Sequence, residues 1–407
     1  MTPTIALPAD VRFLLDTLQN GGYEAYIVGG CVRDSILGRI PQDWDITTSA
    51  LPEQTKALFS HTFDTGIQHG TITVVHNHTN YEITTYRIDG AYDDARHPNA
   101  VSFTSRLEED LLRRDFTMNA IAYHPQVGFR DPFGGRADIA RGCIRGVGDP
   151  ATRFQEDALR MLRCVRFAAQ LGFSVEEQTY RALQEHAALI EKISVERIYQ
   201  ELDKLWKAPY PQKLPLLLQS GLLPHIDQTL AQRISEQSPQ LMAQLTAVPP
   251  RSALRWTLVL QTYTEAEAKA LCKKLKFDNA TTRHILTLLR HLLQQPPQTP
   301  YTVRKLTGEL GVETMQQLLC LQDALYGAET TLHTREILSL VLNAGDCLNL
   351  KMLAVDGKQL QQAGVPAGKA VGEMLALLLD DVLHTPAHNH TDYLLARAAQ
   401  IQAIKKE

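Results

Sequence analysis

The chain has 407 residues, more than one hydrophobic core accommodates, so we expect two or more domains. It is 44% hydrophobic with a formal net charge of −4, so a nucleic-acid partner cannot be inferred from global charge. No apolar run reaches the roughly 18 residues of a membrane span, and the 6 cysteines lack metal-site spacing. The amino-terminal stretch has no signal-peptide pattern, so we expect a cytoplasmic protein with reduced thiols and no membrane segment.

The first predicted elements surround a glycine pair. Residues 8–20 have apolar side chains at helical spacing. Residues 26–28 are β-formers that end at Gly29 and Gly30, and a short helix follows that ends near Gly38. The Gly-Gly turn offers bare backbone N–H groups, which suit the approach of a triphosphate.

One cation and two carboxylates follow this turn. Arg33 lies in the first turn of the short helix, and residues 43–47 predict a second strand. Asp43 and Asp45 are two apart on that strand, so we expect them on the same face, with Trp44 on the other. Converging carboxylates repel unless a cation lies between them, and Mg²⁺ is held by one or two carboxylates plus substrate phosphates. The pattern therefore predicts a magnesium site, although most isolated Asp-x-Asp pairs are solvated strand ends.

The next predicted elements complete a mixed α and β region. Ser49 is a candidate cap for the following helix. Residues 71–76 and 81–87 predict an antiparallel hairpin. Glu82 on its second strand is either a third carboxylate near an attacking hydroxyl or a surface cross-strand partner. Residues 87–106 form a long polar connection, for which the sequence supports only mobility.

A basic segment, RRDFTMNA, occupies residues 113–120 after a predicted helix over 107–114. Arginine binds phosphate bidentately, and a carboxylate can accept a hydrogen bond from a ribose 2′-hydroxyl. Arg114 and Asp115 are therefore candidates for phosphate and ribose recognition, with a surface ion cluster as the alternative. Residues 131–138 then predict a turn that opens a short helix.

Residues 150–171 lack interior Gly and Pro and predict one helix that ends at Gly172. Apolar side chains cover most of its circumference, so it should be largely buried. Charges on a buried helix must face a cleft, a ligand or each other. The charged positions, which recur every third residue, are Asp157, Arg160, Arg163 and Arg166. A solvated stripe with an Asp157–Arg160 ion pair is the structural alternative.

An aspartate beside an arginine can distinguish nucleobases. Cytosine and adenine both present an amino donor beside a ring-nitrogen acceptor, whereas guanine and uracil present the reverse. Aspartate only accepts and arginine only donates hydrogen bonds. Asp157 and Arg160 can therefore select C and A without a nucleic-acid template.

From residue 176 onward the pattern is helical. Ser194 is a plausible cap of a helix that continues through residue 204. Prolines at 209, 211, 215, 249–250 and 296–297 mark breaks. Lys273, Lys274 and Lys276 form a basic cluster, which is either a nucleic-acid backbone contact or a solvated face.

Together these motifs resemble a known family. The stretch with GG, Arg33 and Asp43-x-Asp45 is similar to the first motif of nucleotidyltransferases related to DNA polymerase β. RRDFTMNA at 113–120, DPFGGRAD at 131–138 and EDALR at 156–160 are similar to further motifs of the class II tRNA nucleotidyltransferases, the CCA-adding enzymes, in their compact bacterial form. The resemblance is dense over residues 23–205 and sparse but traceable through the tail. No His-Asp dipeptide is present, so the longer members with an HD domain are not matched.

The resemblance implies an α+β fold, in which a polymerase-β-like nucleotidyltransferase head with a mixed sheet is followed by an all-helical neck, body and tail. The implied boundaries are 1–148 for the head, 149–207 for the neck with a templating helix, 208–297 for the body and 298–407 for a tRNA-binding tail. The implied activity is Mg²⁺-dependent, two-metal addition of CCA to tRNA from CTP and ATP. The sequence leaves the oligomeric state open and is compatible with a homodimer.

The resemblance also assigns roles to residues. Asp43 and Asp45 would hold metal and, with Glu82, act in catalysis. Arg114 would contact nucleotide and Asp115 ribose, while Asp157 and Arg160 would pair with the incoming base. The remaining nucleotide-binding candidates are Gly29, Gly30, Arg33, Arg163 and Arg166, and the polar connection at 88–106 would take part in switching from C to A addition.

The sequence leaves two rival functions open. A bacterial poly(A) polymerase, or an enzyme that adds only A or only CC, would share the head and neck motifs. An RNA-binding or nucleotide-sensing protein without turnover belongs to another class, and the intact pair of Asp43 and Asp45 argues against it.

Overall fold

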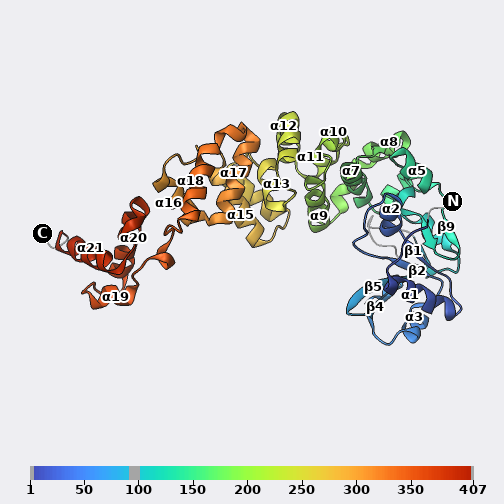
Figure 1. Cartoon of the computed structure of the whole chain (residues 1–407). Helices are drawn as coiled ribbons and strands as arrows, with labels where there is room; N and C mark the ends of the chain where they lie inside the picture. Colours follow the sequence, from blue (N-terminus) through green and yellow to red (C-terminus); the bar gives the residue numbers. More distant parts are fainter. Residues whose placement is uncertain (1–3, 91–100, 405–407) are drawn as a thin grey trace. The chain divides into compact units, whose positions relative to one another are not determined.

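The computed structural model describes residues 4–90 and 101–404. The chain divides into two compact units. The first unit comprises Met1–Met242 with Lys274–Lys276, and the second comprises Ala243–Lys273 with Phe277–Glu407. Figure 1 labels the helices and strands of both units. The boundaries predicted between head, neck, body and tail remain predictions, because the division into two units does not test them.

A seven-stranded mixed sheet forms the centre of the head and confirms the predicted α+β class. Its order is β3-β4-β5-β2-β1-β8-β9, with β2 parallel to β5 and the other neighbours antiparallel. The strands are β1 (Ala25–Val28), β2 (Ile46–Thr48), β3 (Thr62–Gly66), β4 (Thr71–His76), β5 (Thr79–Thr85), β8 (Ala122–His124) and β9 (Gly128–Arg130).

The predicted hairpin is confirmed as β4 and β5. Asn77 and His78 form its turn with φ of 47° and 62°, the left-handed pair that a two-residue hairpin favours. Strand β3 pairs with β4 but was not predicted. It is short, its register shifts between Phe63 and Gly66, and most of its side chains are exposed, so no apolar alternation marks it.

The polar connection over 87–106 is not structureless at its ends. β6 (Arg87–Asp89) and β7 (Val101–Phe103) pair antiparallel in a separate ribbon. Residues 91–100, which include Asp93, Asp94 and Arg96, lie outside the described residues. The mobility predicted for them therefore stays a prediction. A further short parallel pair joins β10 (Cys143–Ile144) to β11 (Ser174–Val175).

Twelve α-helices accompany these strands over residues 4–90 and 101–247. They are α1 (Ala9–Asn20), α2 (Gly30–Ile36), α3 (Pro52–Leu58), α4 (Leu107–Leu112), α5 (Gly135–Arg141), α6 (Pro150–Glu156), α7 (Leu159–Leu171), α8 (Glu177–His186), α9 (Val195–Trp206), α10 (Leu214–Gln219), α11 (Leu222–Ile226) and α12 (Gln228–Ala247). Helix α3 packs on β4 and β5, while α7 packs on α9 (Figure 1).

The single helix predicted over 150–171 is wrong, because Asp157 divides it into α6 and α7. Asp157 has extended backbone angles (φ −140°, ψ 100°), and its Oδ1 accepts a hydrogen bond from the backbone N–H of Leu159 at 3.1 Å. A short acidic side chain can thus offer the backbone an alternative to the helical ladder. Gly172 ends α7 in the left-handed conformation (φ 79°), as predicted.

Two predicted caps differ in the structure. Leu51, not Ser49, occupies the N-cap position of α3, and the Ser49 hydroxyl accepts a hydrogen bond from the Glu24 backbone N–H at 2.9 Å instead. Ser194 does precede α9, but its side chain makes no capping bond. The turn before α5 is confirmed, since Asp131 accepts hydrogen bonds from the N–H groups of Gly135 and Arg136.

A buried cluster fixes α4 against the centre of the sheet. Tyr26 and Val28 of β1 pack with Ala122 of β8 and with Leu107 and Leu111 of α4. Each of these side chains is at most 5% exposed. Because α4 is anchored there, the basic segment that follows it lies beside the end of β1.

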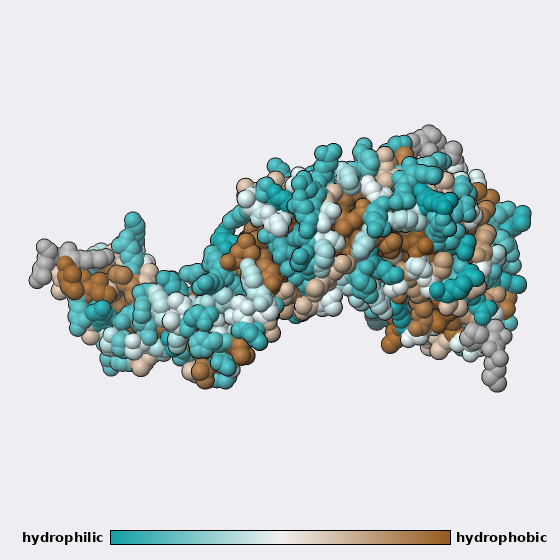
Figure 2. Space-filling view, turned by 90° about the horizontal axis from the view of Figure 1, so that it is seen from above, coloured by the Kyte–Doolittle hydropathy of each residue, from teal (hydrophilic) through white to brown (hydrophobic). Residues whose placement is uncertain are grey.

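The second unit is helical throughout its described residues, as predicted for the carboxy-terminal region. Beyond Ala247 the helices are α13 (Ser252–Val259), α14 (Glu265–Lys274), α15 (Asn279–Leu292), α16 (Pro300–Leu310), α17 (Val312–Tyr326), α18 (Leu332–Asn343), α19 (Gly357–Gln362), α20 (Lys369–His384) and α21 (Thr391–Ile404). Among the described residues, no helix combines the length and apolar character needed to span a membrane. Figure 2 shows apolar side chains in several separate areas of the face it presents.

Candidate active site

Asp43 and Asp45 lie just before β2 rather than on it. The strand begins at Ile46, and the Val28 N–H donates to the Asp45 carbonyl at 3.0 Å, so the ladder with β1 extends only one residue further. The predicted strand over 43–47 is therefore wrong at its start. Both aspartates nevertheless line one cavity, as their predicted common face requires.

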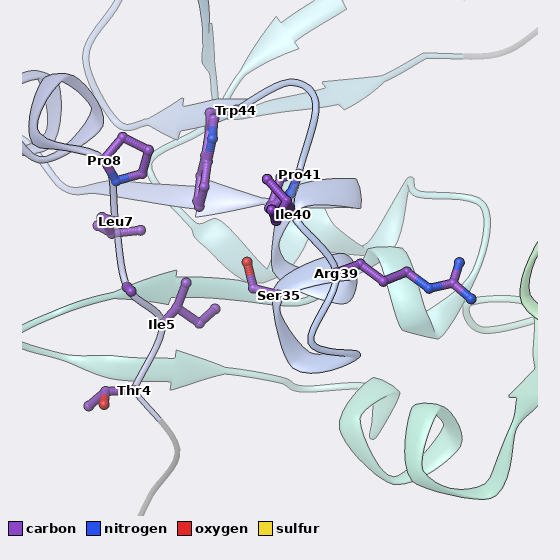
Figure 3. A pocket seen from close by; sticks show the side chains of 10 residues that line it. Thr4, Ile5, Leu7, Pro8, Ser35, Arg39, Ile40, Pro41 and Trp44 are labelled. Carbon is purple, nitrogen blue, oxygen red and sulfur yellow. The ribbon is translucent and has the colours of Figure 1, made fainter.

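This carboxylate cavity has a volume of about 730 Å³. Its lining residues are Pro8, Gln42, Asp43, Trp44, Asp45, Phe63, Thr65, Thr73, Thr79, Asn80, Tyr81 and Glu82. Trp44 also borders a second cavity of about 400 Å³, which contains neither aspartate (Figure 3). The indole thus contributes to both cavities, rather than only turning away from the carboxylates.

The two carboxylates form no hydrogen bond or ion pair with any described residue, and both are exposed at the cavity. Desolvation by the protein around Asp45 raises its pKa, and the charge of Asp43 raises it further, while Arg114 opposes both. A raised pKa is what an acidic group shows when it lacks a sufficient counter-charge.

The donor set at this cavity suits a hard divalent cation, since carboxylate oxygens are the ligands that Mg²⁺ prefers. Among residues 4–90 and 101–404, no group of three His, Cys, Asp or Glu side chains could hold a metal ion. A cation there would therefore have Asp43 and Asp45 as its protein ligands and take the rest from substrate and water. Glu82 lines the same cavity and is exposed.

The Gly-Gly turn connects β1 to α2 as predicted. Gly29 has φ 81° and ψ −128°, and a Cβ built on it would lie 3.1 Å from NH1 of Arg114. Only glycine accommodates both the backbone conformation and this close approach. Because Gly29 has no side chain, the guanidinium of Arg114 can lie against the backbone of this turn.

A fully buried carboxylate holds that guanidinium in place. Asp110 is 0% exposed and forms ion pairs with Arg113 at 2.6 Å and with Arg114 at 3.3 Å. Burial alone would raise the pKa of Asp110, but Arg114 and Arg113 outweigh burial and lower it. The Nε of Arg114 is buried and has no hydrogen-bond partner among the described residues.

A second network joins the predicted ribose residue to two arginines. Asp115 accepts from Nε and NH2 of Arg163 at 2.9 and 2.6 Å, and from Nδ2 of Asn119 at 3.0 Å. The Oδ1 of Asn119 in turn accepts from NH1 of Arg33 at 2.8 Å. Burial opposes ionisation of Asp115, but Arg163 and Asn119 lower its pKa to about 2.

One aromatic ring lies among these cations. The guanidinium carbons of Arg33, Arg163 and Arg166 are 5.1, 5.3 and 3.6 Å from the ring centroid of Phe167. Phe167 is 4% exposed and meets Phe116 edge-on. The electron-rich face of the ring therefore adds to the stabilisation of these cations.

The charged residues predicted to line one helix each have their own partner. Asp157 pairs with Arg197 of α9 at 2.8 Å, and Arg160 pairs with Glu156 at 2.7 Å, so the Asp157–Arg160 ion pair of the structural alternative is not formed. Arg160 also donates to the Arg113 carbonyl at 2.8 Å. Arg166 forms a buried ion pair with Glu201 at 2.7 Å.

Comparisons with known proteins find CCA-adding enzymes that are similar to this chain over nearly its whole length. A CCA-adding enzyme of Geobacillus sp. (strain WCH70) is 39% identical over 382 residues, 93% of each protein. A CCA-adding enzyme of Lactiplantibacillus plantarum is 36% identical over 418 residues, 98% of each protein. This chain belongs to the family of CCA-adding enzymes.

Family models and a solved structure agree with this membership. Residues 25–145 match the model "Poly A polymerase head domain", residues 172–243 match "Probable RNA and SrmB- binding site of polymerase A", and residues 249–398 match the model for tRNA nucleotidyltransferase domain 2. The structure of the Bacillus stearothermophilus CCA-adding enzyme in complex with CTP matches with a TM-score of 0.83 and 33% identity, covering 97% of this chain and 98% of that one.

Four residues of this member of the CCA-adding enzyme family were not predicted as site residues, but the structure places them in the site. Asp110, Asn119, Phe167 and Arg197 each contact a predicted site residue. Asn119 had a signal, since it lies within RRDFTMNA four residues after Asp115. Asp110 had one too, since it lies four residues before Arg114 on the predicted helix. The contacts of Phe167 and Arg197 lie inside an apolar pattern or join separate motifs, so only the fold reveals them.

Proposed function

We propose that this protein adds CCA to the 3′ end of tRNA from CTP and ATP without a nucleic-acid template, releases pyrophosphate at each step and repairs incomplete CCA ends. The observation that carries the proposal is that Asp43 and Asp45, which have no partner among the described residues, face an open cavity, while Arg114 and Arg33 lie at Gly29 and Gly30. Exposed carboxylates that can bind metal, close to cations that can bind phosphate, are what metal-assisted nucleotidyl transfer requires.

Asp43 and Asp45 would hold divalent metal, and Mg²⁺ fits their oxygen donors. When bound, such ions supply Lewis-acid stabilisation of the attacking hydroxyl and of the leaving pyrophosphate. Glu82 lines the same cavity and would accept a hydrogen bond from the ribose of the attacking nucleotide.

The nucleotide would bind over the Gly-Gly turn. Gly29 and Gly30 would allow its phosphates to approach the backbone, and the guanidinium of Arg114, which lies at this turn, would donate to a phosphate oxygen. Arg33 adds a second cation, with its orientation fixed by Asn119 and Asp34. Asp115, kept ionised by Arg163, would accept a hydrogen bond from the ribose 2′-hydroxyl.

Base selection would rest on Asp157 and Arg160, which approach the nucleotide from the junction of α6 and α7. Arg197 forms an ion pair with Asp157, and a carboxylate only accepts hydrogen bonds, which suits the amino group of C or A. Arg160 would donate to the ring nitrogen. Arg163 and Arg166 would support this pocket through Asp115 and Glu201.

The helical region from the neck to the tail would bind the tRNA backbone. Its basic cluster is only partly available, because Lys274 pairs with Asp227 and Lys276 with Glu196, whereas Lys273 is exposed. We retain a cytoplasmic location and a homodimer as proposals, and gel filtration with light scattering tests the latter.

A poly(A) polymerase, or an enzyme adding only part of CCA, is the second candidate, favoured by the match of residues 25–145 to the poly(A) polymerase head. Incubation with tRNA lacking CCA separates the candidates. CTP alone should add two nucleotides, ATP alone none, and the mixture should add CCA and stop. Continued A addition would identify a poly(A) polymerase, and A addition only to tRNA ending in CC would identify a partial enzyme.

A further inference from the structure

The carboxylate cavity extends away from the aspartates across three strands. Phe63 of β3 lies opposite Thr73 of β4, and Thr73 lies opposite Glu82 of β5. Directly opposed residues of antiparallel strands project from one face, and all three line the cavity. Glu82 precedes Ile83, which pairs with Ile46, the residue after Asp45. One row of side chains therefore leads from Asp45 to the exposed ring of Phe63.

Spacing along this row leaves room for one nucleoside. Neighbouring strands are about 4.8 Å apart, so three strand steps separate Asp45 from Phe63 by roughly 14 Å. Phe63 is 59% exposed although it lines a cavity. Trp44 supplies further ring surface to the same space.

The charged side chains of the cavity suit hydroxyl groups directly, whereas phosphates would approach its carboxylates only through a bound cation. Its charged lining residues are Asp43, Asp45 and Glu82, and the described part of the chain contributes no lysine or arginine to the lining. Arg33 and Arg114, the cations that suit phosphates, are not among the lining residues. Acidic oxygens instead suit hydroxyl donors, which the 2′ and 3′ positions of a terminal ribose provide.

We infer that Phe63 stacks on the base of the 3′-terminal nucleoside of the RNA acceptor, whose ribose the proposed function already directs to the carboxylates. The inference rests on the proposed function, because CCA addition changes the terminal base at successive steps. Aromatic stacking tolerates any base, whereas hydrogen-bond readout does not. A ring, rather than polar base-reading groups, is therefore the suitable contact.

The second cavity is a weaker candidate for the same role. Trp44 and Pro8 separate it from the carboxylate cavity, and Figure 3 shows Trp44 standing between Pro8 and Pro41. Its lining includes Ile40, which is 90% exposed, but no carboxylate. A terminal hydroxyl placed there would lie away from Asp43 and Asp45. Ile40 therefore serves as a probe for the competing site.

A stacking measurement tests the inference without catalysis. The full-length protein is titrated with tRNA that ends in 2-aminopurine at the discriminator position, without nucleotide. Stacking on Phe63 should quench its fluorescence, and Phe63→Ala should remove most of the quenching while Phe63→Trp retains it. Phe13→Ala is the matched control, since Phe13 is 46% exposed in the same unit and does not line the cavity. Equal quenching in wild type and Phe63→Ala would overturn the inference.

Kinetics give a second readout. Phe63→Ala should lower kcat/KM for tRNA by about tenfold, within the range that loss of one stacked base produces, and leave the KM for CTP unchanged. Ile40→Ala should change neither. Loss with Ile40→Ala but not with Phe63→Ala would assign the terminal base to the second cavity. If wild-type protein adds no nucleotide yet quenches 2-aminopurine through Phe63, the proposed function fails while the binding site stands.

Discussion

The carboxylate cavity and the arginine network differ in how their charges are neutralised. Asp43 and Asp45 are exposed and have no partner among the described residues. Arg33 and Arg163, by contrast, each already hold a carboxylate or amide within 2.9 Å. The acidic side has only the charge of Arg114 to oppose its own and needs further counter-charge from a ligand, whereas the basic side is organised before any ligand arrives.

This difference separates two kinds of pre-organisation. Fixed hydrogen bonds hold donors at the positions where phosphate, ribose and base must lie, so little ordering remains on binding. Two neighbouring carboxylates without a partner among the described residues instead favour the binding of a divalent cation. Substitutions should accordingly abolish chemistry on the acidic side and weaken or misdirect nucleotide binding on the basic side.

The largest effect is expected on the acidic side. Asp43→Ala and Asp45→Ala should each reduce C and A addition by about three powers of ten or more, because metal stabilisation is lost. Binding of tRNA, measured by filter retention, should stay within about twofold. Asp64→Ala is the control, since Asp64 is exposed in the same unit but pairs with Lys56 outside the cavity. Near-normal turnover in either variant would remove the metal-site assignment.

The base-reading position should show a smaller but selective effect. Asp157→Ala should lower kcat/KM for CTP and ATP by one to about two powers of ten, the value of a hydrogen bond to a charged group. UTP and GTP should lose less, because their carbonyls are repelled by the carboxylate.

The cap of the neighbouring helix provides the control for this position. Asp149 accepts from the Thr152 N–H at the start of α6, so Asp149→Ala should lower thermal stability and affect all four nucleotides alike. An equal fall for all four nucleotides in Asp157→Ala would show that this side chain has only a structural role.

Phosphate recognition should be indifferent to the base. Arg114→Ala should raise the KM for CTP and ATP by about the same factor, near tenfold, since its guanidinium would donate to a phosphate that both nucleotides share. Arg113→Ala removes the other guanidinium held by Asp110 and should change KM less. A loss confined to one nucleotide would mean that Arg114 contacts the base.

The smallest effect concerns stability. The pKa of Asp115 is lowered to about 2 by Arg163 and Asn119, so its stabilising contribution, about 2 kcal/mol, is present above pH 4 and is lost as pH falls toward 2. Urea unfolding of Asp115→Asn and wild type should therefore differ at pH 6 and converge with acidification. A difference in unfolding free energy that does not depend on pH would contradict this pairing.

Much of the head followed from local sequence. The turn at Gly29, the hairpin of β4 and β5 and the end of α7 at Gly172 were predicted, because glycine conformation and apolar alternation act over a few residues. The strand β3 and the interruption at Asp157 were not. Strand β3 has no buried face that would mark it in the sequence. The interruption at Asp157 arises because its carboxylate accepts a hydrogen bond from the Leu159 backbone and pairs with Arg197.

The sequence by itself determined which chemistry-bearing residues are present, their motif spacing and their family. Only the tertiary structure decided their partners. Arg160 pairs with Glu156 and Asp157 with Arg197, although spacing alone allowed these two to pair with each other. The physical reason is that ion pairs and cavity walls depend on distances between elements remote in the chain, and packing sets those distances. The role proposed for Phe63 likewise depends on the pairing of neighbouring strands, which places its side chain in a row with Asp45.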